Sequence, residues 1–150
     1  PRGTGHSIAG LAVTGNVFRL FGSTIDRVEK VDSSFATFNA ASFRNVVFSN
    51  NSFNGVTQAT ASPILIEHNQ NTESNTWVVN AAGYLPFGGR ARNVAGLVAE
   101  GAITTSAGIP QYVMPYTLTE QSTNGQSVHL KWPSAVKGRA QVTIRCDNPL

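Results

Sequence analysis

The sequence predicts an all-β protein in which a coil of short stacked strands is followed by a compact antiparallel domain. Charged residues make up only 13% of the chain, about half the usual share of ~25%. The polarity comes instead from 13 Asn, 13 Ser and 14 Thr. No stretch keeps a helical i, i+3, i+4, i+7 pattern over several turns, whereas strand-like alternation is common. The third observation is an internal repeat near the N-terminus.

The repeat pairs Ser7–Phe18 with Ser42–Phe53 without a gap. Apolar residues fall on apolar ones and an Asn falls on an Asn. The matched pairs are Leu11 with Val46, Val13 with Phe48, Asn16 with Asn51 and Phe18 with Phe53. One such turn cannot bury its apolar face, but stacked turns form a continuous core. The repeat therefore predicts short parallel strands with the apolar side chains of the first two pairs inside.

A weaker third copy extends the predicted coil over residues 7–71. It is Ile64–Asn69, which places Ile64, Ile66 and Asn69 on Val46, Phe48 and Asn51. Asn suits the predicted bends because it tolerates left-handed backbone, and stacked amides can hydrogen-bond along the coil. The long first interval predicts a degraded turn around Val28–Phe35. A sandwich whose strands are similar by coincidence is the alternative.

The polar run Asn69–Thr76 predicts a boundary, which divides the chain into rungs over residues 1–74 and a β domain over residues 75–150. Five strands are predicted after it: Trp77–Asn80, Ala91–Ala99, Gln111–Thr119, Ser127–Trp132 and Arg139–Cys146. The last is the clearest, because apolar Ala140, Val142, Ile144 and Cys146 alternate with polar residues. We expect the last two strands to form a hairpin across Pro133–Gly138.

Composition excludes several classes of partner and cofactor. The net charge is +3, but the basic residues are scattered, so no nucleic-acid binding is expected. A single Cys146 allows no internal disulfide and is predicted to be a buried small hydrophobe. No metal-ligand spacing is present, and no cofactor is expected. No apolar run reaches the ~20 residues that span a bilayer, so no membrane insertion is expected. The start at Pro1 suggests a processed or excised piece.

The short-strand coil, with its Asn bend in Phe48–Phe53 and a separate β domain after it, resembles right-handed parallel β-helix proteins of the pectate-lyase superfamily. It is most similar to the C-terminal part of bacteriophage tailspikes. The LPFGGRARNV and VTIRCDNPL stretches are similar in style to domains that follow such helices. The resemblance implies the last rungs of a right-handed parallel β-helix and a small antiparallel β-sandwich-like domain. It also implies a homotrimer, an extracellular or virion location, and a parent protein that binds and degrades bacterial surface polysaccharide.

No catalytic residue is predicted. Glycoside hydrolysis needs two carboxylates about 5–10 Å apart, and the chain has eight acidic residues. Asp26, Glu29 and Asp32 form the one local group, which we interpret as solvated charges paired with Arg27 and Lys30. The candidate carbohydrate-binding residues are Glu67, His68, Glu73 and Trp77, with ordinary turn or strand residues as the alternative. Trp132 continues an apolar alternation and is predicted to lie in the core.

Three functional classes follow. The first is a structural module, the trimerising end of a tailspike-like protein, in which the segment after Trp77 supplies most of the interface. Its aromatic residues Tyr84, Phe87, Tyr112 and Tyr116 are of the kind enriched at interface cores. The second class is part of a secreted polysaccharide lyase or hydrolase whose active site lies in these rungs. The third is a stand-alone carbohydrate-binding β domain. The chain alone is expected to lack polysaccharide-cleaving activity.

Overall fold

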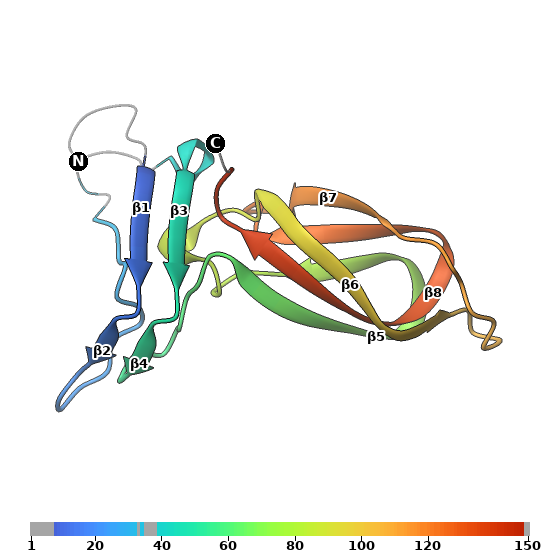
Figure 1. Cartoon of the computed structure of the whole chain (residues 1–150), viewed down its shortest axis with the longest axis horizontal. Coiled ribbons are helices and arrows are strands. Elements are labelled where there is room, and N and C mark those ends of the chain that lie inside the picture. Colours follow the sequence, from blue (N-terminus) through green and yellow to red (C-terminus); the bar gives the residue numbers. More distant parts are fainter. Residues whose placement is uncertain (1–7, 33, 35–38, 149–150) are drawn as a thin grey trace.

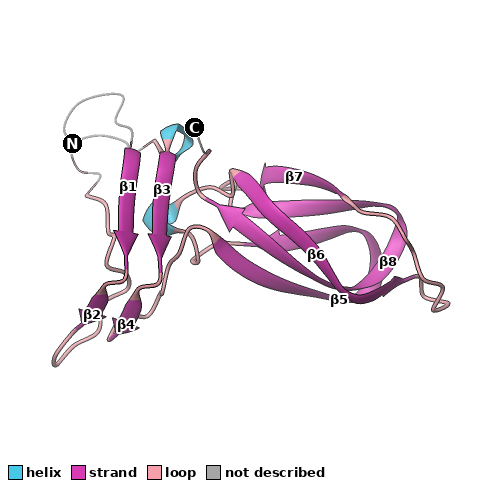
Figure 2. Cartoon of the chain, viewed as in Figure 1, coloured by secondary structure: helices cyan, strands magenta, loops and turns pink. Residues whose placement is uncertain are grey.

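The computed structural model describes residues 8–32, 34 and 39–148. Within them the chain is all-β, as predicted, with two single-turn 3-10 helices, η1 (Ala40–Ser42) and η2 (Pro86–Gly88), and no α-helix. A small region of parallel strands lies beside an elongated antiparallel region (Figures 1 and 2). We call them the parallel region, β1–β4, and the antiparallel region, β5–β8.

The parallel region confirms the pairing predicted for the first two copies of the repeat. Strand β1 (Ala9–Thr14) pairs in parallel with β3 (Arg44–Ser49), and β2 (Val17–Arg19) pairs in parallel with β4 (Ser52–Asn54). The partners keep the offset of the sequence alignment: Leu11 faces Val46, Val13 faces Phe48 and Phe18 faces Phe53. A further parallel bridge joins Ile25 to Val56. The predicted degraded turn at Val28–Phe35 falls partly outside the described residues, and its described part forms no strand.

The two Asn residues lie at equivalent bends and contact each other, as predicted. Asn51 Oδ1 accepts hydrogen bonds from the backbone N–H of Asn16 at 3.0 Å and from Asn16 Nδ2 at 3.2 Å. Asn51 Nδ2 donates to the carbonyl of Val13 at 2.9 Å. Two residues after each Asn, the rings of Phe18 and Phe53 stack with centroids 5.5 Å apart. The repeat therefore brings both amides and aromatic rings into register.

The prediction that Ile64–Asn69 forms a third parallel rung is wrong. Residues Ile64–Asn69 belong to β5 (Ile64–Asn80), which pairs antiparallel with β8 (Ser127–Arg145), so that Ile64 faces Ile144. An offset of 18 residues is about half of the 35-residue period, too short to return the chain to the same face of the coil. The apolar alternation of Ile64 and Ile66 suits either partner, because both pairings need the same pleat.

The polar run Asn69–Thr76 is strand rather than turn, since β5 continues through it to Asn80. The pairing with β8 is irregular there, with register shifts on both sides of Ser74. Ser74 Oγ donates to the Thr76 carbonyl at 2.8 Å and accepts from the Thr76 N–H at 3.1 Å. Local hydroxyl contacts of this kind satisfy backbone groups where the ladder is interrupted. Residues 64–74, placed in the rungs by the sequence, thus lie in the antiparallel sheet.

The predicted hairpin across Pro133–Gly138 is also wrong, because both of its strands belong to the single strand β8. Strand β8 pairs with β5 along its length, with β6 (Asn93–Thr104) over its second half and with β7 (Tyr116–Gln121) over its first half. Pro133 lies where the pairing with β5 jumps from Val136 to Lys131. Proline is tolerated at such an irregularity because no regular ladder hydrogen bond is required of it.

The core of the antiparallel region is built around Trp77, which is fully buried. Its indole Nε1 donates to the carbonyls of Val136 at 3.1 Å and Ser74 at 3.2 Å. Its ring lies 4.8 Å, centroid to centroid, from that of Trp132, which is in the core as predicted. The predicted alternation at the end of β8 is confirmed, since Ala140, Val142, Ile144 and Cys146 are all buried.

The two regions join along β3. Asp147 has a fully buried side chain: its Oδ2 accepts the Val46 N–H at 2.8 Å, and Arg145 donates to both carboxylate oxygens at 2.9 Å. Asn148 forms a parallel bridge with Arg44 and Ser62 an antiparallel bridge with Phe48. These contacts cover the edge of β3 that faces away from β1. Among the described residues, no strand pairs with the opposite edge of β1.

Candidate functional site

The predicted carbohydrate-binding residues Glu67, His68 and Glu73 lie on β5 but do not converge. Glu67 is exposed and its Oε1 is 4.0 Å from Arg139 Nη1. His68, the next residue, points to the opposite face of the strand, where its ring lies 5.7 Å from that of Trp77. Glu73 Oε2 accepts the N–H of Ser106 at 2.9 Å. Each side chain therefore has a separate local partner.

Trp77 is not available to a sugar. A ring that stacks on a pyranose must present a face to solvent, whereas Trp77 has no exposed surface and both its ring and its N–H contact the core. The sequence makes Trp77 a candidate because it is predicted to open a strand, where a ring is more open than in the core. In the structure it lies inside β5, on the same buried face as Val79 and opposite Leu130 of the neighbouring strand β8.

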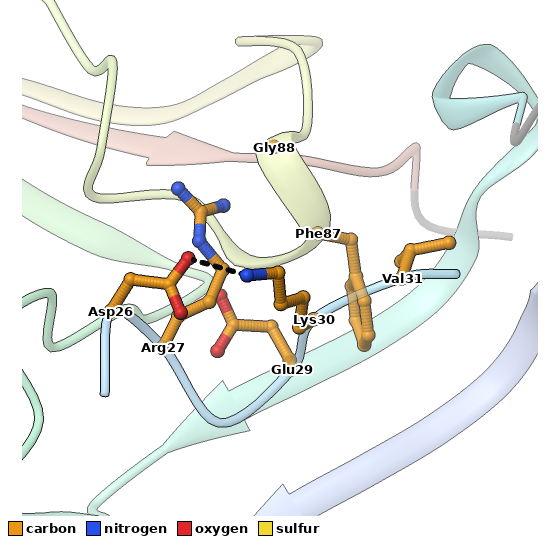
Figure 3. Close-up of a pocket in the computed structure, with 7 residues that line it drawn as sticks. All are labelled: Asp26, Arg27, Glu29, Lys30, Val31, Phe87 and Gly88. Atoms are coloured by element: carbon orange, nitrogen blue, oxygen red, sulfur yellow. Dashed lines mark ion pairs between the residues drawn. The ribbon is translucent and has the colours of Figure 1, made fainter. Parts of the chain in front are cut away.

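A cavity of about 270 Å³ lies where the segment 26–31 meets the turn around η2 (Figure 3). The segment 26–31 follows β2 in the parallel region, and the turn around η2 lies between β5 and β6 of the antiparallel region. The cavity therefore forms only when the two regions pack together. Its lining combines acidic, basic and apolar side chains. The lining residues are Asp26, Arg27, Glu29, Lys30, Val31, Phe87 and Gly88.

Two of the charged side chains behave as predicted. Lys30 Nζ lies 3.4 Å from Asp26 Oδ2, and both side chains are exposed. A hydrogen bond from the Arg27 backbone, and to a lesser degree the charge of Lys30, hold the pKa of Asp26 below its ordinary value. The Arg27 guanidinium pairs with Gln58 Oε1 rather than with a carboxylate. Asp26 and Lys30 thus form a solvated surface pair.

Glu29 departs from the prediction. Its side chain is buried, with 8% of the residue exposed, and neither carboxylate oxygen has a hydrogen-bond partner among the described residues. Sequence reasoning missed this because Asp26, Glu29 and Asp32 are evenly spaced and all have basic neighbours. A buried carboxylate without a donor is unfavourable. Glu29 is therefore the side chain of this cavity most in need of a partner.

A second feature is a group of exposed apolar side chains in the segment that links β6 to β7 and at the first residue of β7. We call it the 109–116 patch: Ile109, Tyr112, Val113, Met114 and Tyr116. Tyr112 is 94% exposed and Tyr116 is 70% exposed. A hollow of about 320 Å³ is lined by three members of the patch, by Pro110 and Gln111 and by residues of β6. The link between β6 and β7 reaches the end of the molecule farthest from β1–β4 (Figure 1).

Sequence reasoning identified Tyr112 and Tyr116 as interface candidates but missed the three aliphatic members of the patch. A signal was present: the apolar run Tyr112–Tyr116 contains Pro115 and lacks the alternating polar residues of a strand with one buried face. Phe87, a third interface candidate, is half-buried and packs edge-on against Phe43 and Phe48.

Comparison of the chain with models of protein families, with curated proteins and with solved structures finds no match. Within the described part of the chain, no three His, Cys, Asp or Glu side chains gather as metal ligands. No helix there is long and apolar enough to cross a membrane. A function for this chain must therefore be argued from the two edges of the parallel region, the cavity and the 109–116 patch.

Proposed function

We propose that this chain is the C-terminal structural and trimerisation region of an extracellular protein of the bacteriophage tailspike type. In this proposal β1–β4 are the last rungs of a right-handed parallel β-helix, and β5–β8 form a sandwich-like domain that closes its end. The parent protein recognises and degrades bacterial surface polysaccharide, whereas this region holds the assembly together.

The observation that carries the proposal is the difference between the two edges of the parallel region. The edge of β3 is covered by Ser62, Asp147 and Asn148, whereas the edge of β1 pairs with no other described strand. An open edge with half-buried apolar residues needs a neighbour, because unpaired strand edges promote association. A stack of rungs that continues on the β1 side and is closed on the β3 side would satisfy both edges.

The hydrogen bonds between Asn16 and Asn51 also support a further rung on the β1 side of the parallel region. Asn51 Oδ1 accepts the backbone N–H of Asn16 in the rung beside it. Asn16 Oδ1 is the equivalent acceptor one rung earlier, and it is exposed with no partner among the described residues. A preceding rung would supply the N–H that this oxygen lacks.

The 109–116 patch supports the trimerisation part of the proposal. Monomeric proteins rarely expose contiguous apolar surface of this kind unless it is an interaction site. Aromatic and Met side chains are the types enriched at the centres of protein interfaces. A ring around a three-fold axis buries the same patch of each subunit without leaving one unpaired.

Oligomeric state tests the proposal. Light scattering at micromolar concentration should report a mass near three times 15.9 kDa. The double variant Tyr112→Ser with Met114→Ser should shift the protein to monomer with an unchanged far-UV spectrum. Val17→Ser, which removes an apolar side chain 71% exposed in the parallel region, is the matched control and should leave the trimer intact. A monomer mass that does not depend on concentration would defeat the proposal.

A turnover assay on bacterial surface polysaccharides separates this role from that of an enzyme fragment. The chain alone should show no cleavage. Robust turnover that disappears in Glu67→Ala or Asp32→Ala would assign the active site to this chain instead.

A further inference from the structure

We propose that the cavity between the segment 26–31 and the turn at Phe87–Gly88 binds a neutral, hydroxyl-rich ligand of the size of one sugar ring, with Glu29 as the principal acceptor. This inference goes beyond the proposed assembly role and does not depend on trimerisation. It rests on an unsatisfied buried group, on the balance of charge around it and on the size of the cavity.

The first step is the carboxylate of Glu29. It lines the cavity, and Figure 3 shows it directed toward the side chains of Arg27 and Lys30. Neither oxygen has a donor among the described residues. Hydrogen bonds to a charged group stabilise more than neutral ones, and leaving such a group unpaired is correspondingly unfavourable. A ligand that donates O–H groups to Glu29 would remove this penalty, so binding is favoured at this position.

The charged side chains around the cavity favour a ligand without net charge. The lining holds two carboxylates, Asp26 and Glu29, and two cations, Arg27 and Lys30, of which Asp26 and Lys30 already pair. Outside that pair, a metal ion would find one carboxylate, Glu29, beside the positive charge of Arg27, far from the six to eight oxygen ligands that Ca²⁺ takes. An anion would be repelled by Glu29. A hydroxyl group donates to a carboxylate and accepts from a cation at the same time, so a neutral polyol suits all four side chains.

The third step is size and shape. A volume of about 270 Å³ lies just below the usual range of ~300–1,000 Å³ for small-molecule pockets, which favours one ring over a chain of sugars. Phe87 and Val31 supply an apolar wall for the C–H face of such a ring. Phe87 is held with φ at 60°, a backbone strain that tends to persist at ligand sites. Its ring is braced by Phe43 and Phe48, with centroids 5.8 and 6.4 Å away.

The test is an NMR titration of the full chain with glucose, galactose and N-acetylglucosamine, and separately with calcium chloride and sodium glucuronate. We expect saturable shifts of the backbone amides of residues 26–31 and 87–88 with at least one neutral sugar, and none with the two salts. Response to a salt alone would overturn the ligand class. Absence of any shift with the three sugars would overturn the site.

Variants test the role of Glu29. Glu29→Gln keeps the shape but loses the charge, so the affinity for the bound sugar should fall about tenfold, the effect of one charge-assisted hydrogen bond. Because it also removes an unsatisfied buried charge, the same variant should raise the thermal midpoint of the free protein. Arg19→Gln, which neutralises an exposed charge on β2 outside the cavity, should change neither. Lys30→Gln alters only a solvated side chain and should weaken binding without affecting the fold. Unchanged affinity in both cavity variants would contradict the proposal.

Discussion

The parallel and antiparallel regions use the same alternation of side chains but bury it to different degrees. In the antiparallel region, alternate residues of β5 and β8 meet in a closed core, where Trp77, Val79 and Leu130 are fully buried. In the parallel region, Val46 and Phe48 of β3 are buried, whereas their register partners Leu11 and Val13 of β1 are half-buried. The local pattern is equivalent in the two strands, so the difference comes from their neighbours.

In a stacked coil, the burial of a strand's apolar side chains depends on whether it has a neighbour on both of its edges. Strand β3 lies between β1 and the end of the antiparallel region, and β1 has a described neighbour on one side only. The core of the antiparallel region is closed by its own strands, while the parallel region is covered only on its β3 side. Four predictions follow from this contrast, in order of decreasing effect.

Substitution of Trp77 by Ala should have the largest effect. It removes a fully buried indole and two hydrogen bonds to backbone carbonyls, so the free energy of unfolding should fall by about 3–5 kcal/mol. Urea denaturation followed by circular dichroism measures the change. Val78→Ala, the next residue on the outer face of β5, is the control and should stay within about 0.5 kcal/mol. A small effect of Trp77→Ala would show that the antiparallel core is not closed.

Asp147→Asn should weaken the junction of the two regions. Burial by itself raises the pKa of Asp147, but hydrogen bonds from Arg145 and from the Val46 N–H outweigh it and hold the pKa below the ordinary value of 3.8. At neutral pH the variant loses charge-assisted bonds to a mostly buried Arg145, which should destabilise the protein by about 2–3 kcal/mol.

The pH dependence of the stability difference between the parent chain and Asp147→Asn tests whether the carboxylate charge causes it. Because the pKa of Asp147 is lower in the folded state, its contribution is fully present above the unfolded pKa near 4 and is lost as the pH falls through the folded value. Unfolding curves of the parent chain and Asp147→Asn should therefore converge as the solution is acidified below about pH 4. A stability difference that stays constant as the pH falls well below 4 would mean that the carboxylate charge is not responsible.

Asn51→Ala should have a smaller effect that is confined to the parallel region. The Asn51 side chain makes hydrogen bonds to Asn16 and Val13, and their loss should reduce stability by about 1–2 kcal/mol. Amide hydrogen exchange should accelerate at Asn16 and through β1 while the centre of β5 stays protected. Asn54→Ala, at an exposed position of β4, is the matched control. Equal acceleration in both regions would show that they unfold together.

Cys146 should show the smallest response. Burial raises the pKa of its thiol to about 11, so the group is protonated near pH 8 and has no reactive thiolate. A thiol reagent at that pH should label the native protein no faster than it unfolds. Rapid stoichiometric labelling in native buffer would indicate that the end of β8 opens locally.

The parts of the fold that could be predicted are those in which a short segment shows a repeat or an alternation of apolar and polar residues. The pairing of Ser7–Phe18 with Ser42–Phe53 predicted the register of β1 with β3 and of β2 with β4, because matched side chains make like-with-like contacts in a parallel stack. Ser7 itself lies outside the described residues. The alternation before Cys146 likewise predicted the buried face of β8.

The candidate site was less predictable. The acidic residues Asp26 and Glu29 lie three positions apart and look alike in sequence, yet the first is solvated and the second is buried by packing of the junction. The sequence predicts Trp77 at the start of a strand, whereas β5 begins thirteen residues earlier, at Ile64, and buries it. The walls of the cavity come from segments about 60 residues apart, and no local pattern connects them.

The sequence by itself determined the all-β class, the 35-residue register of the parallel region and the inward face at the end of β8, because these depend on alternation and repetition that can be read from short segments. Only the tertiary structure decided that Ile64–Asn69 joins an antiparallel sheet, that β8 is one strand and that Glu29 is buried. The physical reason is that an alternating strand can pair with either a parallel or an antiparallel neighbour. Which neighbour it meets is settled by contacts between segments distant in the chain.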